Sequence, residues 1–414
     1  MRLPKLRRSG PAMADRAARV KGRAALALAL GALLLGAAAV ACASLRSGSS
    51  TRGNGAGWNG FGAGNWPGAG WRPYADGSPF NQPIGKATVH PNSAALVAGV
   101  LQWGGPSDIT AGTAGSSEDW GHPVYFAQPS DHVYVLRATE SWGRNALTGM
   151  RIRIPAQARP AGGGDGHMTV VTPDGWEYDF WRAKAPPAGG GEFDFAWGGR
   201  VRILGSGLGS GATAARFASL AGVIRPEELA AGRIDHALFI VLKCTGSGAG
   251  FGYGAHQSSS RWTGGFVYPA QAGAGTCGQQ DPKLPPLGAR FQLAMSRAQI
   301  AALHVPAWKR AILTALARYG GYAGDSGGPG FAVSVQSGVT YTSFGVPDRL
   351  VQVAQGAGIR ASGGLYALDL AGGVDWRRYL RVVTPPARHS ATRRHTHRTR
   401  AQTRTRTSVR SGDA

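Results

Sequence analysis

Short runs in which apolar and polar residues alternate recur through the middle of this chain, and they constrain its fold more than any other feature. Successive side chains of a β-strand point to opposite faces, so this alternation predicts half-buried strands. The clearest runs are at residues 132–136, 150–154, 200–204, 237–243, 290–295, 331–335 and 365–370. Glycine and proline bound them, and the pattern predicts a mainly β protein with a β-sandwich or jelly-roll-like core.

A few inserted helices are expected between these strands, at residues 93–102, 212–224, 296–303 and 306–319. Ser296 can cap the third helix. Pro306 stands at the start of the fourth, and Gly320 and Gly321 follow its end, which are good start and stop signals.

The first 45 residues have the order of a secretion signal. Basic residues reach to Arg23, residues 24–40 are uncharged and rich in Ala and Leu, and small residues follow from Ala41. This order predicts a signal peptide and a secreted or cell-surface protein. An uncleaved signal-anchor is the alternative, since a spanning helix needs about 20 apolar residues. Lipidation at Cys42 is a second alternative.

Three further regions differ in composition. Residues 46–71 are rich in Gly and Trp and are expected to form a flexible linker. Residues 72–384 have the length of one large domain or two fused ones. Residues 385–414 are a basic Arg/Thr/His tail that is expected to be disordered, because it cannot bury a core. The tail either binds anionic wall polymers or lipid surfaces, or has no partner.

The net charge of +23 is concentrated at the two ends of the chain. Residues 1–45 and residues 385–414 each carry +7, which leaves +9 for the middle. No zinc-finger, helix-turn-helix or ribonucleoprotein motif accompanies this charge, so we do not expect specific nucleic-acid binding. The sequence leaves the oligomeric state open.

The cysteines agree with export. Cys42 lies in the signal region, which leaves Cys244 and Cys277 as a pair. In an oxidising compartment such a pair is expected to form a disulfide, the alternative being two buried free thiols.

A hairpin is predicted at residues 165–181, where two alternating runs flank Pro173-Asp174-Gly175. In the register that the apolar residues favour, Thr172 opposes Trp176. One face is then apolar and belongs to the core, with Met168, Val170, Trp176, Tyr178 and Phe180. The other face carries His167, Thr169, Val171, Glu177, Asp179 and Trp181. We expect this second face to look outward, into solvent or a cleft.

The polar hairpin face suggests catalysis. Glu177 and Asp179, with His167 and Asp165 nearby, could divide acid and base work in glycoside cleavage. Trp181 offers a flat surface for a sugar ring. In a lyase, His167 or Tyr178 would act as base. The alternative is an ordinary hairpin with a solvated polar face.

Two further pairs of residues are candidates. Asp235 and His236 precede an apolar run and could form an oriented general base, or could simply end a turn. Arg151 and Arg153 share one strand face, where they could bind uronate carboxylates or keep an exposed sheet soluble.

Residues 324–329 read Gly-Asp-Ser-Gly-Gly-Pro, which is the motif around the nucleophile of chymotrypsin-like serine proteases. That chemistry also needs a histidine base and a buried aspartate. No segment of the type that carries the protease histidine is found upstream, and the motif follows a predicted helix directly. We interpret it as turn chemistry and expect Ser326 to be dispensable.

Several segments together resemble a group of exported, largely uncharacterised proteins of high-GC soil bacteria. They are residues 73–81, 165–181, 221–238, 284–293 and 312–328. The resemblance implies a secreted β-rich domain that acts on carbohydrate. It carries no established reaction, so no catalytic residue follows from it.

Three functions follow from these patterns. The first is a secreted glycoside hydrolase, or a lyase acting on an anionic glycan of the cell wall or surroundings. The second is a non-catalytic glycan-binding protein, and the third is a trypsin-like protease. No metal-ligand spacing, phosphate loop or cofactor fingerprint is found in the sequence, so no cofactor or metal is expected.

Overall fold

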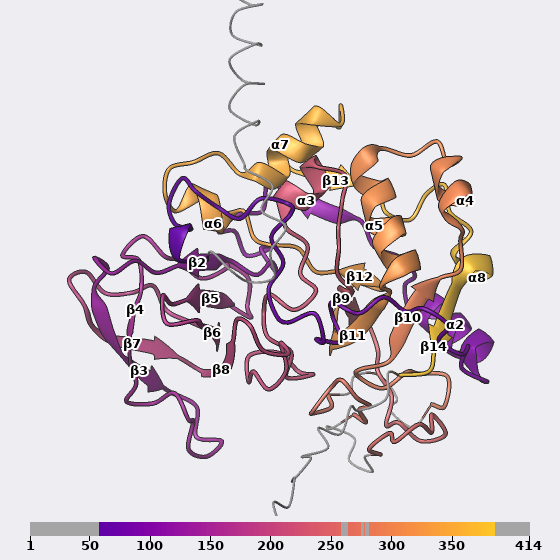
Figure 1. The fold of residues 1–414 in the computed structure, drawn as a ribbon, viewed down its shortest axis with the longest axis horizontal. Helices are drawn as coiled ribbons and strands as arrows, with labels where there is room; N and C mark the ends of the chain where they lie inside the picture. The colour runs from indigo at the N-terminus through magenta and orange to yellow at the C-terminus, as the bar shows by residue number, and fades with distance from the viewer. Residues whose placement is uncertain (1–57, 258–263, 275–276, 278–280, 386–414) are drawn as a thin grey trace, which may run out of the picture. The chain divides into compact units, whose positions relative to one another are not determined.

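The computed structural model describes residues 58–257, 264–274, 277 and 281–385 (Figure 1). The protein is mainly β, with 23% strand and 16% helix. Several sheets and few helices confirm the fold class expected from the alternating runs, and they are consistent with a sandwich-like core. The predicted signal peptide, the first part of the linker and the basic tail from residue 386 lie outside the described residues.

The helices are short. In chain order they are η1 (Trp58–Gly60), α2 (Ser93–Gln102), α3 (Pro226–Ala230), α4 (Arg297–Ala301), α5 (Ala307–Arg318), α6 (Val339–Thr342), α7 (Arg349–Gly356) and α8 (Trp376–Tyr379). The expected helix at residues 93–102 is present as α2. Ser296 caps α4, and Pro306 precedes α5.

Within the part of the chain that the structure describes, the strands form four sheets. They are β1 (Ile109–Ala111), β2 (Val124–Phe126), β3 (Val133–Ala138), β4 (Arg151–Arg153), β5 (Met168–Val171), β6 (Trp176–Trp181), β7 (Gly191–Phe195), β8 (Trp197–Arg202), β9 (Leu238–Leu242), β10 (Arg290–Leu293), β11 (Gly321–Ser326), β12 (Ala332–Val333), β13 (Tyr366–Leu368) and β14 (Leu380–Val383).

The largest sheet has five strands in the order β12-β9-β11-β10-β14, and β9 and β11 run parallel. Helix α5 packs beside β10 (Figure 1). Large apolar side chains of the sheet, among them Phe239, Phe291 and Tyr322, are fully buried in the main core. Burial of such side chains is the principal stabilising contribution to a core of this kind.

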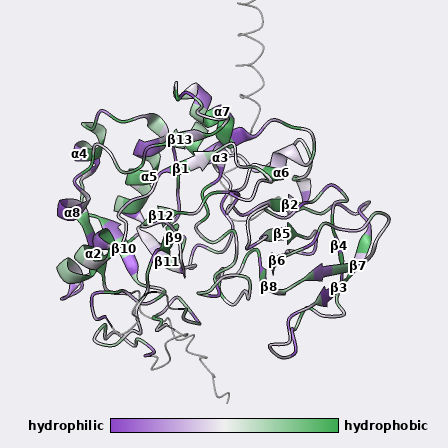
Figure 2. Cartoon of the chain, turned by 180° about the vertical axis from the view of Figure 1, so that it is seen from behind, coloured by the Kyte–Doolittle hydropathy of each residue, from purple (hydrophilic) through white to green (hydrophobic). Residues whose placement is uncertain are grey.

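A second group of strands carries the hairpin. Strands β2, β5, β6 and β8 form a four-stranded sheet, and β4, β3 and β7 form a three-stranded one. A separate apolar cluster that includes Tyr134, Phe180 and Phe193 lies between them. The apolar colour of β5 in Figure 2 reflects burial of this strand on both faces.

The predicted hairpin is present in the predicted register. Met168 pairs with Phe180 and Val170 with Tyr178, while the Thr172 amide donates to the Trp176 carbonyl at 2.8 Å. Gly175 has φ +81°, a left-handed conformation that glycine adopts readily at such a turn.

Two local predictions are wrong. Residues 212–224 form an irregular segment instead of a helix, because their amides bond to other parts of the chain: Ala215 N, for example, donates to Gly324 O at 3.0 Å. Of residues 324–329, interpreted above as turn chemistry, the first three belong to β11 at the centre of the largest sheet, and the chain bends only from residue 327 onward. A Cβ at Gly324 would lie 2.4 Å from the Phe239 ring, so glycine permits this close packing.

Residues 58–71 of the expected linker pack on the core. Trp71 is buried, and its ring meets Phe61 edge-on at 5.6 Å between centroids. The ring of Trp66 lies 5.0 Å from that of Tyr341. These aromatic side chains therefore contribute to the domain itself.

Cys244 and Cys277 form the predicted disulfide, with 5.5 Å between their Cα atoms. The bond closes a loop with a sequence separation of 33 residues, for which the chain-entropy model gives about 3–4 kcal/mol of stabilisation. Within the described residues, no helix is long and apolar enough to cross a membrane.

Candidate functional site

The polar face of the hairpin is buried, so the expectation that it looks outward is wrong. Glu177 and Asp179 are both 0% exposed. Glu177 accepts hydrogen bonds from the Tyr74 hydroxyl at 2.6 Å and from the Leu220 amide at 2.9 Å, and Asp179 accepts one from Thr169 Oγ1 at 2.8 Å. The segments around Tyr74 and Leu220 cover this face, which the local alternation alone could not reveal.

These two carboxyl groups hold protons more tightly than usual. Burial raises the pKa of Glu177 well above its ordinary range, and the charge of Asp179 adds to the shift. Burial also raises the pKa of Asp179, although hydrogen bonding from Thr169 opposes the shift. Because both are fully enclosed, the geometry gives Glu177 and Asp179 a structural role between the hairpin and its covering segments.

Asp165 and Trp181 come together at the open end of the hairpin. Asp165 precedes β5, Trp181 ends β6, and Trp181 Nε1 donates a 3.0 Å hydrogen bond to Asp165 Oδ1. The Arg182 amide bonds to the Asp165 carbonyl at 2.8 Å, and Arg182 adopts φ +49°. A non-glycine residue in this region is uncommon and can mark a functional position. Both side chains are half-buried.

Asp325, at the end of β11, is electrostatically coupled to Asp165. Burial raises the pKa of the Asp325 carboxyl to about 6, the hydrogen bond from the Ser326 amide opposes the shift, and the negative charge of Asp165 adds to it. Strand β11 belongs to the largest sheet, whereas Asp165 belongs to the hairpin. The bond from Ala215 N to Gly324 O is one contact that joins these regions.

Two stacked histidines lie beside this carboxylate pair. The rings of His122 and His167 are 4.4 Å apart and nearly parallel, and both side chains are buried. Burial lowers the pKa of His167, an effect that the charge of Asp165 opposes, and burial lowers the pKa of His122 further below its usual range. Both imidazoles are therefore neutral near pH 7.

Two exposed indole rings contact neighbours of Asp165. Trp142 is 62% exposed and stacks on Trp181, with ring centroids 5.5 Å apart, and it also lies 5.7 Å from Trp197. Trp120 is 56% exposed and borders the segment that leads to Asp165. Flat apolar rings beside carboxylates are typical of sites that bind sugars.

Asp235 and His236 lie elsewhere. Strands β9 and β11 run parallel, and both residues precede β9, whereas Asp325 pairs with Val241 near the other end of these strands. His236 and Asp325 are therefore about 16 Å apart along the strand direction. Asp235 forms ion pairs with Arg233 and Arg318. Neither residue joins the group around Asp165.

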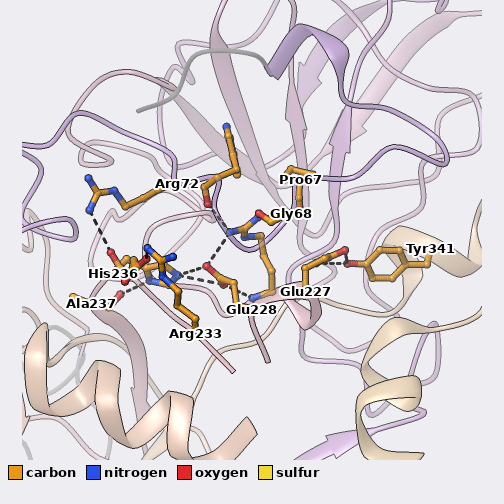
Figure 3. Close-up of polar contacts among 12 residues, drawn as sticks. Pro67, Gly68, Arg72, Glu227, Glu228, Arg233, His236, Ala237 and Tyr341 are labelled. Carbon is orange, nitrogen blue, oxygen red and sulfur yellow. Dashed lines mark hydrogen bonds and ion pairs between the residues drawn. The ribbon is translucent and has the colours of Figure 1, made fainter. Parts of the chain in front are cut away.

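His236 belongs to a buried ionic network (Figure 3). Its Nε2 lies 3.2 Å from Glu228, which also pairs with Arg225 at 2.8 Å. Burial alone would raise the pKa of Glu228, but the charges of Arg225 and His236 outweigh it and lower the pKa to about 2. Arg225 donates as well to the carbonyls of Pro67, Gly68 and Trp71, so the network fastens the N-terminal segment to the core.

Arg151 and Arg153 lie on β4, in the three-stranded sheet. Arg151 is exposed, and Arg153 donates to the Asp131 carbonyl. The hydrogen bonds of the described residues include none from Ser326 Oγ to a histidine, and the neighbouring Asp325 accepts from backbone amides. This geometry does not favour the protease hypothesis.

Sequence reasoning identified Asp165, His167 and Trp181 but missed the rest of the group, which consists of Trp120, His122, Trp142, Trp197 and Asp325. A usable signal existed for two of them, since Trp120 and Trp142 each precede a glycine in a polar loop. Asp325 was set aside together with the protease-like motif that contains it.

No group of His, Cys, Asp and Glu within the described ranges is arranged to hold a metal ion. No protein-family model matches the chain. Neither a curated protein nor a solved structure matches it.

Proposed function

We propose that this protein is a secreted glycoside hydrolase that cleaves a cell-wall or extracellular polysaccharide, with Asp165 and Asp325 as its catalytic residues. Two observations carry the proposal: the Asp165 carboxylate accepts a hydrogen bond from an indole, and the charge of Asp165 contributes to the raised pKa of Asp325. Asp325 is half-buried with a pKa of about 6, and Asp165 accepts a hydrogen bond from Trp181. Glycoside hydrolysis needs such a division between two carboxyl groups.

In the proposed reaction, protonated Asp325 acts as general acid and gives its proton to the leaving glycosidic oxygen as the C–O bond breaks. Asp165 acts as general base. It removes a proton from the water whose oxygen bonds to the anomeric carbon, so that one water is consumed for each bond cleaved. Trp181 positions Asp165 through Nε1 and presents its ring to the sugar.

Export is part of the proposal. The order of basic, apolar and small residues in the first 45 positions supports secretion. The Cys244–Cys277 disulfide supports an oxidising compartment. The basic C-terminal tail would hold the enzyme near anionic wall polymers.

The test is a screen of the purified full chain against plant, fungal and bacterial wall polysaccharides, followed by Asp325→Asn and Asp165→Asn on any substrate that is cleaved. We expect each substitution to lower kcat about 10²–10⁴-fold. Asp194→Asn is the control, because Asp194 lies on β7 in an ion pair with Arg137 and is not one of the two proposed catalytic groups. Full activity in both site variants would refute the assignment.

A non-catalytic glycan-binding protein is the second candidate, favoured by the exposed rings of Trp142 and Trp120. Binding of a polysaccharide without any cleavage, unchanged in Asp325→Asn, would support this candidate instead.

A further inference from the structure

Two strongly exposed tryptophans, Trp142 and Trp120, contact different neighbours of Asp165. They are the most exposed large apolar side chains among the described residues, at 62% and 56%. Their relation to Asp165 follows from contacts on each side.

On the first side, three indoles form one contiguous surface. Trp181 and Trp197 are directly opposite in the pairing of β6 and β8, and Trp142 contacts both rings. The loop that carries Trp142 is fixed at both ends. Glu140 pairs with Arg182 at 3.6 Å, and Asn145 donates to the Gly198 carbonyl at 3.0 Å. The ring of Trp142 is therefore held in place over Trp181.

On the second side, Trp120 packs against the glycines that precede Asp165. A Cβ at Gly164 would lie 3.6 Å from the Trp120 ring, and the Gly163 amide donates to the Asp119 carbonyl at 2.9 Å. Contacts thus run from Trp120 through Gly164 to Asp165, and from Asp165 through Trp181 to Trp142. Both exposed rings are therefore linked to Asp165 through its immediate neighbours.

We infer that this surface binds the interior of a polysaccharide chain, with sugar units on both sides of Asp165. The sugar units on one side of Asp165 would stack on Trp120. Those on the other side would stack on the surface formed by Trp142, Trp181 and Trp197, which we call the indole surface. Sugar rings have apolar faces that pack on flat aromatic rings, while their hydroxyl groups reach polar neighbours. The inference rests on the proposed function and adds that cleavage is internal.

Binding can be measured apart from cleavage. Asp325→Asn serves as the background, and the probes are xylan, laminarin, polygalacturonate and glycol chitin, tested by affinity electrophoresis. For a polymer that the background protein binds, we expect Trp120→Ala and Trp142→Ala each to weaken binding at least about tenfold, which corresponds to about 1.4 kcal/mol. Trp103→Ala is the matched control, since Trp103 is 38% exposed at the end of α2 and should leave binding unchanged.

Chain length provides the second arm. A disaccharide cannot occupy both sides at once, so its binding should respond to at most one of the two substitutions, whereas polymer binding should respond to both. In the active enzyme, early products should be oligosaccharides of mixed length.

The outcomes separate the two claims. Polymer binding that is equal in Trp120→Ala, Trp142→Ala and Trp103→Ala overturns the inference, as does binding of none of the four polymers. If cleavage depends on Asp325 while Trp120→Ala and Trp142→Ala bind normally, the proposed hydrolysis is supported and the inferred binding surface is wrong. If both tryptophan substitutions weaken binding but no polymer is cleaved, the inferred binding surface is supported and the proposed hydrolysis is wrong.

Discussion

Trp181 Nε1 donates a 3.0 Å hydrogen bond to Asp165 Oδ1 across the open end of the hairpin. The two residues are 16 positions apart, and the register of β5 and β6 brings them together. The bond links the aromatic surface to a carboxylate, so changes at Trp181 should separate sugar binding from chemistry.

Trp181→Phe should retain polymer binding and lower kcat. The substitution keeps a flat ring but removes the donor to Asp165, and a hydrogen bond to a charged group contributes about 1.5–3 kcal/mol, or roughly 10–100-fold in rate. Trp197→Phe is the control, because Trp197 shares the surface without that bond. Steady-state kinetics on the cleaved polymer measure both effects, and an equal loss in the two variants would contradict the assigned role.

The pH profile should report Asp325. A general acid must be protonated, and burial raises the pKa of Asp325 to about 6. We therefore expect kcat/KM to fall about tenfold per pH unit above pH 6, since this parameter reports the free enzyme. Asp325→Asn should show low activity without that decline. A rate that is constant from pH 6 to 8 in the unsubstituted protein would remove Asp325 as the acid.

Glu177→Gln should make stability less dependent on pH. Burial raises the pKa of Glu177 in the folded state, so folded protein retains a proton that the unfolded chain releases above about pH 4.3. Stability is thus full at low pH and is lost as the pH rises toward the folded-state pKa, by up to about 1.4 kcal/mol per pH unit for one proton. Glutamine cannot ionise, and its amide can still bond with Tyr74 and Leu220.

Urea unfolding at pH 5, 7 and 9 tests this sign. The unsubstituted protein should lose more stability over this range than Glu177→Gln. Glu192→Gln, on the exposed edge of β7, should behave like the unsubstituted protein. Parallel profiles in all three proteins would show that Glu177 does not hold the extra proton.

Arg225→Ala should destabilise the fold by about 3–5 kcal/mol, because it leaves the buried carboxylate of Glu228 without its partner. It also removes the bonds to the carbonyls of Pro67 and Trp71. Arg318→Ala, which breaks an exposed 3.9 Å pair, should change stability by about 0.5 kcal/mol or less. Urea midpoints measure the difference. A small effect at Arg225 would mean that the network in Figure 3 contributes little.

The local sequence determined many of the strands, three of the four expected helices and the hairpin register. Alternation has a period of two in any strand, and Pro173-Asp174-Gly175 marks a turn, so Met168 and Phe180 could be paired without knowledge of the rest of the chain. The helix cap at Ser296 was predicted from local sequence, and the Cys244–Cys277 disulfide was predicted from the number of cysteines. The structure contains both the cap and the disulfide.

Only the tertiary structure decided what covers each face. Glu177 and Trp181 lie on the same hairpin face, yet segments distant in sequence enclose Glu177, whereas Trp181 lies at the open end. The same distant contacts bring Asp325 near Asp165 and turn residues 212–224 from the expected helix into a segment bonded to β11. Burial depends on long-range packing, which periodicity within a single strand does not contain.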